Sequence, residues 1–157
     1  MSTVALRLIK DSDLDAIFEQ MRDPVSVQMA AFTADDPNDR TAFDSHMAKV
    51  MSSPDVMNRV ITSDERFVGT IACFVLDGVT EVTYWLIRPL WGRGIASRAL
   101  ELLLQEVPVR PIRARVASDN IGSLRVLQKT GFKSIGTEVS FAPARGAAIE
   151  ETLLELT

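Results

Sequence analysis

Apolar and polar positions in the first third of the chain change from strict alternation to helical spacing. Residues 4–9 alternate and predict a first strand. Residues 11–21 begin with acidic side chains that suit a helix N-terminus and continue with apolar positions on one helical face, and Pro24 lies just beyond the predicted end. Residues 33–40 are rich in Asp, Pro and Asn and predict a loop. A second helix is predicted at about 41–51.

The middle of the chain has the period of strands, and the last third alternates strands with helices. Three segments rich in β-branched and aromatic residues are separated by short polar turns, which predicts an antiparallel meander. The order of elements indicates an α+β fold, with a single mixed, mostly antiparallel sheet flanked by helices on both faces and residues 1–157 as one domain. The predicted strands are 56–62, 66–76, 81–87, 111–116, 132–141 and 149–156, and the predicted helices are 94–106 and 120–129.

The composition is that of an ordinary globular protein and limits the possible chemistry. Hydrophobic residues make up 46% and charged residues 24% of the 157 residues. The single cysteine, Cys73, and the single histidine argue against a structural zinc site, so we expect no metal. No apolar run approaches the ~18 residues of a membrane span, and the first residues lack the pattern of a secretory signal. We therefore expect a cytoplasmic protein with no membrane partner, as a monomer or a homodimer.

Charge is distributed unevenly along the chain. The net charge of −4 argues against nucleic acid as a partner, because nucleic-acid binding depends on a basic surface. The segment from Arg88 to Lys133 nevertheless carries nine basic and three acidic side chains, a formal charge of +6, and the remainder carries −10. Either these charges lie on solvated faces, or the basic segment binds a compact polyanion and the acidic remainder receives a cationic partner.

The most specific segment runs from Tyr84 to Ser97 and reads Tyr-Trp-Leu-Ile-Arg-Pro-Leu-Trp-Gly-Arg-Gly-Ile-Ala-Ser. An apolar strand ends at a proline, and Gly92 and Gly94 then permit backbone conformations that other residues avoid, directly before a helical pattern. Such a turn leaves several N–H groups pointing the same way at a helix N-terminus, which favours an anion. Arg93 could add charge-assisted hydrogen bonds to phosphate oxygens.

Two other interpretations of this turn stay open, and one is excluded. The turn could connect a strand to a helix without binding any ligand. It could also be a dinucleotide fingerprint with Ser97 as the third small residue, although an antiparallel meander precedes it and the acidic residue expected after the next strand is missing. A Walker-type phosphate loop is excluded, because no lysine follows the second glycine.

Two motifs at a set spacing resemble a known family. Residues 84–97 resemble a strand-turn-helix motif of the form Gln/Arg-x-x-Gly-x-Gly/Ala through Gly94 and Ala96, with Trp91 where the general form has Gln or Arg. Residues 116–132, Val-Ala-Ser-Asp-Asn-Ile-Gly-Ser followed by Leu-Gln-Lys-Thr-Gly-Phe, resemble an Asn-x-x-(Ala/Ser)…Gly-Phe segment. On these motifs the chain resembles the GNAT (Gcn5-related) N-acetyltransferase superfamily, in particular the RimJ/RimL-like type that acetylates ribosomal-protein N-termini.

The resemblance implies the GNAT fold and acetyl-CoA as cosubstrate, whose diphosphate and 3′-phosphate would account for the local excess of positive charge. A backbone N–H near Leu86 or Ile87 would point at the thioester carbonyl, and the pantetheine arm would pair with the edge of the strand at 81–87. Asn120 would hold that arm or the loop around it. The residues expected to bind acetyl-CoA are Leu86, Ile87, Trp91, Gly92, Arg93, Gly94, Ile95, Ala96, Ser97, Asn120 and Ser123.

The resemblance also implies direct transfer to an amine without a covalent enzyme intermediate, so Cys73 is expected to be a buried strand thiol. Glu81 is the candidate general base, or else an ordinary solvated carboxylate. Many members of the family place a tyrosine acid where this chain has Leu127, so Ser123 is the candidate proton donor, or else a helix-capping or packing residue. Tyr84 is a weaker candidate for the proton donor, or else an ordinary residue of the sheet.

The preferred acceptor is the α-amine of a protein or peptide, and the loop from Phe32 to Arg40 is expected to line its site. Three alternatives remain. The acceptor could be a small amine such as a polyamine, an amino acid or an aminoglycoside. The chain could be a sensor that binds acyl-CoA without turnover. It could also bind a nucleotide instead of CoA.

Overall fold

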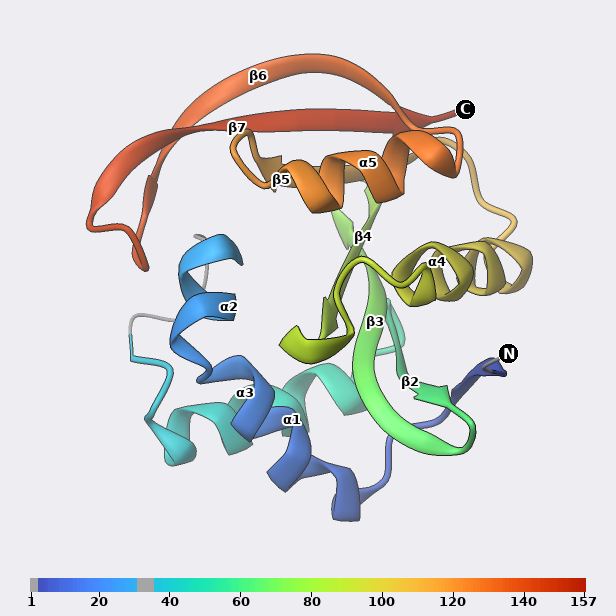
Figure 1. Cartoon of the computed structure of the whole chain (residues 1–157), viewed down its shortest axis with the longest axis vertical. Helices are drawn as coiled ribbons and strands as arrows, with labels where there is room; N and C mark the ends of the chain where they lie inside the picture. The colour runs from blue at the N-terminus through green and yellow to red at the C-terminus, as the bar shows by residue number, and fades with distance from the viewer. Residues whose placement is uncertain (1–2, 31–35) are drawn as a thin grey trace.

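The computed structural model describes residues 3–30 and 36–157. Their seven strands form one sheet in the order β1-β2-β3-β4-β5-β7-β6, in which only β4 and β5 are parallel neighbours (Figure 1). The strands are β1 (Val4–Arg7), β2 (Val56–Ser63), β3 (Arg66–Leu76), β4 (Val79–Leu86), β5 (Ile112–Ala117), β6 (Lys133–Ala142) and β7 (Ala147–Leu156). The helices are α1 (Leu14–Met21), α2 (Pro24–Ala30), α3 (Arg40–Ser52), α4 (Ile95–Glu106) and α5 (Ile121–Lys129), with short 3-10 turns η1 (Asp11–Asp13) and η2 (Arg88–Leu90).

Helices cover both faces of the sheet, as the sequence predicted. Alternate residues of a strand point to opposite faces, so each face has its own apolar core. On one face, Ile71 of β3 packs in a core that contains Leu100 and Leu103 of α4. On the other face, Phe18 of α1 and Phe43 of α3 pack with their ring centroids 5.1 Å apart in an edge-to-face arrangement. The sheet therefore separates α4 and α5 from α1 and α3.

The strands β4 and β5 separate after a short paired segment. Only Thr80 with Ile112 and Glu81 with Arg113 are paired between them. Beyond this point β5 follows β7, with which it pairs from Ile112 to Ala117, while the end of β4 stays paired with β3. The backbone groups on the facing edges of β4 and β5 are thus left without a neighbouring strand in the middle of the sheet.

Helix α2 is an element that the sequence analysis missed. Pro24 was interpreted as the residue after a helix, but it occupies the first turn of α2. Proline fits there because the first N–H groups of a helix have no intrahelical partner. Asp23 caps this helix: its Oδ2 accepts hydrogen bonds from the Ser26 N–H (3.0 Å) and hydroxyl (2.8 Å). An acidic residue followed by proline was therefore a start signal. Phe32 and residues 33–35 of the predicted loop at 33–40 lie outside the described residues.

No helix in the described parts of the chain, 3–30 and 36–157, is long and apolar enough to cross a membrane. The longest is α3, with 13 residues.

Gly69 allows the end of β4 to lie very close to β3. A Cβ atom at this position would be 2.1 Å from the carbonyl oxygen of Trp85 and 3.0 Å from the Cα of Leu86. Both atoms belong to the backbone, so neither can rotate away as a side chain could. The small size of this residue thus fixes the path of the last residues of β4, directly beside the gap between β4 and β5.

We expect Gly69→Ala to lower the free energy of unfolding by about 1–3 kcal/mol, the usual cost of overpacking a core. The measurement is urea-induced unfolding followed by circular dichroism. Gly122→Ala is the matched control: its Cβ would meet only Asn120 Oδ1, at 4.0 Å, and alanine is the better helix former, so this variant should be equally or more stable than the parent. Equal stability of the two variants would contradict the close approach at Gly69.

Candidate functional site

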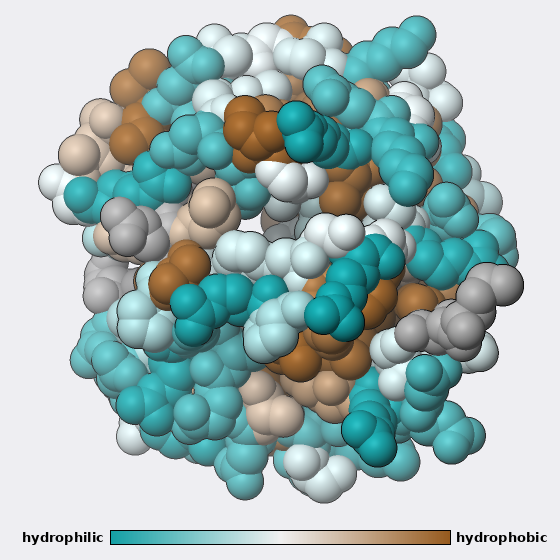
Figure 2. All heavy atoms as spheres, viewed as in Figure 1, coloured by the Kyte–Doolittle hydropathy of each residue, from teal (hydrophilic) through white to brown (hydrophobic). Residues whose placement is uncertain are grey.

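A cavity of about 590 Å³ opens where β4 and β5 separate. This volume lies in the range of small-molecule sites. Figure 2 shows the surface hollowed between the part formed by α5, β6 and β7 and the part that contains α2 and α4. The cavity reaches both faces of the sheet, since α4 and α5 contribute to its lining on one side and Ser26 and Met29 of α2 on the other. The main lining segments are residues 82–86, 90–97, 114–117, 120, 122–123 and 125–127, together with Lys129 and Glu151.

The glycine turn forms one end of the cavity. Gly92 and Gly94 have φ angles of 78° and 79°, in the left-handed region that glycine adopts without strain. Gly94 is the N-cap of α4 and offers no side chain to the helix, and the first helical bond runs from the Arg98 N–H to the Gly94 carbonyl (3.1 Å). The N–H groups of Ile95, Ala96 and Ser97 therefore have no hydrogen-bond acceptor within the helix. Free N–H groups at the positive end of a helix dipole favour an anion, so these three are candidates to bind one.

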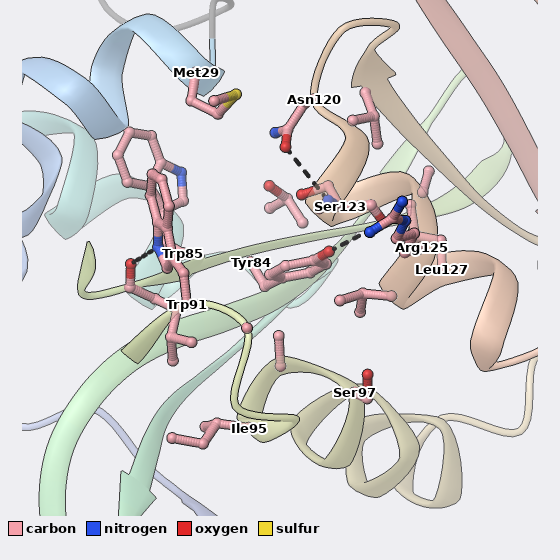
Figure 3. Close-up of a pocket in the computed structure, with 18 of the residues that line it drawn as sticks. Met29, Tyr84, Trp85, Trp91, Ile95, Ser97, Asn120, Ser123, Arg125 and Leu127 are labelled. Atoms are coloured by element: carbon pink, nitrogen blue, oxygen red, sulfur yellow. Dashed lines mark hydrogen bonds between the residues drawn. The ribbon is translucent and has the colours of Figure 1, made fainter. Parts of the chain in front are cut away.

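Trp91 fixes this turn against the end of β4. Its indole Nε1–H donates a hydrogen bond of 2.8 Å to the carbonyl of Leu86 (Figure 3). The side chain stays partly exposed and lines the cavity. The sequence motif pointed to Trp91 as a cofactor residue, and the structure shows in addition how it holds the motif in place.

Three basic side chains at the cavity have no acidic partner among the described residues. Arg93 of the turn and Arg125 and Lys129 of α5 line the cavity, and none of them forms an ion pair with the residues that the structure describes. Arg98 and Arg115, by contrast, pair with Glu101 and with Glu81. The basic side chains without an ion pair among the described residues thus line the same cavity as the free N–H groups of the turn. Sequence reasoning did not single out Arg125 and Lys129, although their spacing of four residues places them on one face of a helix.

The N–H groups of Leu86 and Ile87, either of which was expected to face a thioester, point to opposite edges of β4. The Ile87 N–H donates to the carbonyl of Val68 at 2.9 Å, and Ile87 does not line the cavity. The expectation for Ile87 as a donor to a ligand is therefore wrong, because its N–H is already satisfied within the sheet. Successive N–H groups of a strand point to opposite edges, so the Leu86 N–H faces the gap toward β5. Leu86 also lines the cavity and is the remaining candidate.

Asn120, Ser123 and Tyr84 surround the same space (Figure 3). Asn120 is the N-cap of α5, and its Oδ1 accepts a hydrogen bond from the Ser123 N–H at 3.3 Å. The Tyr84 hydroxyl donates a long bond of 3.5 Å to the Ser123 carbonyl, and burial raises the pKa of Tyr84 to about 12. The Ser123 hydroxyl has no hydrogen-bond partner among the described residues, so it is available to a ligand. Leu127, at the position where many relatives have tyrosine, is fully buried in the core.

Glu81 is not the solvated carboxylate that the sequence left as one alternative. Only 4% of its surface is exposed, and both of its carboxylate oxygens accept hydrogen bonds from Arg115 Nε, at 3.1 and 3.2 Å. It does not line the cavity. Glu81 thus forms a buried ion pair with Arg115 of β5. Its role as a general base stays a prediction.

The remaining reactive side chain, Cys73, is buried on β3 with 4% exposure and does not line the cavity. Burial raises the pKa of its thiol to about 11, which disfavours the nucleophilic thiolate. In the described part of the chain, no group of three or more His, Cys, Asp or Glu side chains is arranged to hold a metal ion.

Most of the residues expected to bind acetyl-CoA line this one cavity, together with the candidate donors Tyr84 and Ser123. Of the residues predicted to bind acetyl-CoA or to act in catalysis, only Ile87 and Glu81 do not line it, and neither do residues 36–40, the described part of the loop predicted to line the acceptor site. The structure thus brings together the two sequence motifs, residues 84–97 and 116–132, which are separated by 18 residues in the chain.

Comparison with known proteins shows the family and the fold to which the chain is similar. The sequence matches the family model described as acetyltransferase (GNAT) domain over residues 3–133. The probable N-acetyltransferase YjcK of Bacillus subtilis (strain 168) is 34% identical over 82 residues, which are 47% of this chain and 45% of YjcK. The match therefore spans less than half the length of that relative.

Solved structures show the same fold at low identity. RimJ of Mycobacterium smegmatis, in complex with CoA-disulfide, has a TM-score of 0.83 at 24% identity over 98% of this chain and 81% of RimJ. The spermidine N-acetyltransferase of Vibrio cholerae, in complex with CoA and spermine, has a TM-score of 0.82 at 15% identity over 98% of this chain and 94% of that protein. These likenesses establish the fold, and since the family model covers most of the sequence, the chain belongs to the GNAT family of acetyltransferases.

Proposed function

We propose that this protein is an acetyl-CoA-dependent N-acetyltransferase that moves the acetyl group directly to an amine, preferably the α-amine of a protein or peptide. One observation carries the proposal. The cavity between β4 and β5 has free N–H groups and unpaired basic side chains at one end, and it continues through the sheet to α2 on the other face. A polyanionic thioester and an amine could thus meet within the sheet.

The residues present fit coenzyme A. Its diphosphate would be bound by the N–H groups of Ile95, Ala96 and Ser97, with Arg93 adding charge-assisted hydrogen bonds. The unpaired Arg125 would neutralise further phosphate charge, as would Lys129 one turn along α5. The edge of β4 that faces the gap provides backbone groups for the amides of the pantetheine arm, and the Nδ2 of Asn120 is free for the same arm, because only its Oδ1 caps α5.

Acetyl-CoA supplies the acetyl thioester, and this chain positions and polarises it. The Leu86 N–H would donate to the carbonyl oxygen as negative charge develops there, which by analogy with oxyanion holes contributes about 3–4 kcal/mol. The Ser123 hydroxyl would provide the proton that the leaving sulfur takes. Holding the two reactants together in the cavity would supply most of the remaining acceleration. No side chain needs to form a covalent bond with the acetyl group.

A protein α-amine suits this site because it must attack as the free base. The pKa of an α-amino group is about 7.7–8.0, so part of it is neutral at pH 7, whereas a lysine side chain at about 10.4 is almost wholly charged. The likeness to RimL, a ribosomal L7/L12 alpha-N-protein acetyltransferase, supports an N-terminal acceptor, and the likeness to a spermidine acetyltransferase favours a small polyamine as the second candidate.

The test is an acetylation screen of the full chain against peptides with free N-termini and against small amines, with product masses measured by mass spectrometry and free thiol release measured in parallel. We expect a mass increase on peptide N-termini and stoichiometric thiol release. Binding of CoA without thiol release from any amine would indicate a sensor. Calorimetric affinity for NAD or ATP that equals the affinity for CoA would indicate a nucleotide-binding protein.

A further inference from the structure

Glu151 of β7 is a buried carboxylate that faces the cavity without a partner. It is 7% exposed and belongs to the cavity lining, and no described residue donates a hydrogen bond to it or forms an ion pair with it. Its oxygens are not among the fully buried, unpaired side-chain atoms of the described residues, so they remain accessible from the cavity. A carboxylate that is shielded from bulk water but open to a cavity is suited to bind a cationic ligand there.

The groups around Glu151 are mostly negative. Glu81 of β4 and Glu138 of β6 both bind Arg115 of β5, with Nε to Glu81 at 3.1 Å and a terminal nitrogen to Glu138 at 3.2 Å. Glu138 is the cross-strand partner of Glu151, so the two side chains share one face of the sheet. One guanidinium thus pairs with two of the three carboxylates, and when all three are ionised the cluster has a formal charge of −2.

The surroundings oppose ionisation of Glu151 and would favour a cation beside it. Its pKa lies above the ordinary range, first because of burial and then because of the charges of Glu138 and Glu81, while Arg115 acts in the opposite direction. The side chains of α2 that line the same cavity, Ser26 and Met29, carry no charge. A positively charged group in the cavity would relieve the repulsion among the carboxylates.

We propose that the Glu151 carboxylate binds the ammonium group of the acceptor and takes one of its protons, so that the acceptor becomes the neutral amine and Glu151 the neutral acid. This inference rests on the proposed function, since it supplies that reaction with its base. In the balanced step an N–H bond of the acceptor breaks, the electron pair stays on nitrogen, and the proton bonds to a Glu151 oxygen. The raised pKa makes this transfer less uphill than it would be to an ordinary glutamate.

In this arrangement Glu81 is a positioning residue. It is as buried as Glu151, but Arg115 occupies both of its oxygens and it does not line the cavity. By holding Arg115 toward β4, Glu81 keeps that guanidinium from pairing directly with Glu151. Glu151 remains the carboxylate that a ligand in the cavity can reach.

The first test compares E151Q with E138Q in the full chain, using the best acceptor from the screen. Glu138 is the matched control because it belongs to the same cluster and pairs with Arg115, yet its side chain is half-exposed and lies outside the cavity lining. We expect E151Q to lower kcat/KM about 10²-fold at pH 7, within the range of general-base catalysis, and E138Q to stay within about threefold. Affinity for CoA should be unchanged in both variants.

The pH dependence separates a base from a structural group. Above about pH 8 an α-amine is largely neutral in solution, so the deficit of E151Q should narrow as the pH rises through the acceptor pKa. A carboxyl whose pKa is raised by folding costs stability as the pH increases beyond its unfolded value of about 4.3. E151Q should therefore unfold at an equal or higher urea concentration than the parent at pH 7. If kcat/KM of E151Q is reduced by the same factor at every pH and the variant is also less stable than the parent, Glu151 has a structural role and the inference is overturned.

A binding measurement makes the test independent of turnover. In protein with ¹³C-labelled glutamate and bound CoA, the side-chain resonance of Glu151, assigned by its absence in E151Q, should shift when ethylammonium chloride is added, and its apparent pKa should fall. Sodium chloride at the same concentration controls for ionic strength. If ethylammonium moves only the Glu138 resonance or none, the inference fails even where the enzyme is active. If wild-type protein binds no CoA and acetylates nothing, the proposed function fails instead.

Discussion

Gly94→Val should abolish measurable binding of CoA. The φ angle of Gly94 is 79°, which a β-branched residue rarely adopts, so the N-terminus of α4 should rearrange. A Cβ atom there would meet no protein atom within 4 Å, which means that its branches would extend into the space beside the free N–H groups instead of clashing with the protein. We expect a loss of at least 10²-fold, about 2.7 kcal/mol, because strain and obstruction act together.

Calorimetric titration with CoA checks this result, and Gly146→Val serves as the matched control. Gly146 also has a positive φ, of 61°, and a Cβ there also meets nothing within 4 Å, but it lies in the turn between β6 and β7 outside the cavity lining. The control should share the backbone strain and keep the affinity for CoA. Unchanged affinity in Gly94→Val would remove the proposed diphosphate site.

Ser123→Ala should lower turnover about 10²-fold with little change in CoA affinity, as expected for the loss of a general acid. The structure supports this because Ser123 lines the cavity and its hydroxyl has no hydrogen-bond partner among the described residues. The cap of α5 uses the Ser123 backbone N–H and so survives the substitution. Steady-state kinetics and calorimetry together give the two quantities.

Tyr84→Phe tests the other candidate donor. The Tyr84 hydroxyl already donates to the Ser123 carbonyl, so its removal should affect turnover less than Ser123→Ala does. A rate of Ser123→Ala within twofold of the parent would return Ser123 to packing and capping. A larger deficit in Tyr84→Phe would make Tyr84 the donor.

Where the local pattern was strong, the sequence predicted the elements correctly. The meander at β2 to β4 and the alternating strands and helices that follow agree with the structure to within a few residues, because periods of 2 and 3.6 are set by how each strand or helix presents its side chains. Helix α2 was missed because it has only seven residues and starts at a proline. The cap from Asp23 to Ser26 is the signal that a closer reading of the sequence would have found.

Some features of the candidate site could likewise be predicted from the sequence, and others could not. The glycine turn and the cap at Asn120 were predictable, since each depends on residues adjacent in sequence. The hydrogen bond from the Ile87 N–H could not be predicted, because its acceptor, the Val68 carbonyl, lies on another strand. Nor could the sequence show that Glu81 binds Arg115, which is 34 positions away, or that β7 brings Glu151 to the cavity.

The sequence by itself determined the α+β order of elements, the left-handed turn before α4 and the concentration of basic residues around it, because φ preferences, helical spacing and charge are properties of short segments. Only the tertiary structure decided where β4 and β5 separate, which N–H groups and carboxylates remain unpaired at that gap, and which side chains from distant strands share it. Hydrogen bonds and ion pairs between strands depend on register, and register is fixed when the whole sheet packs against its helices.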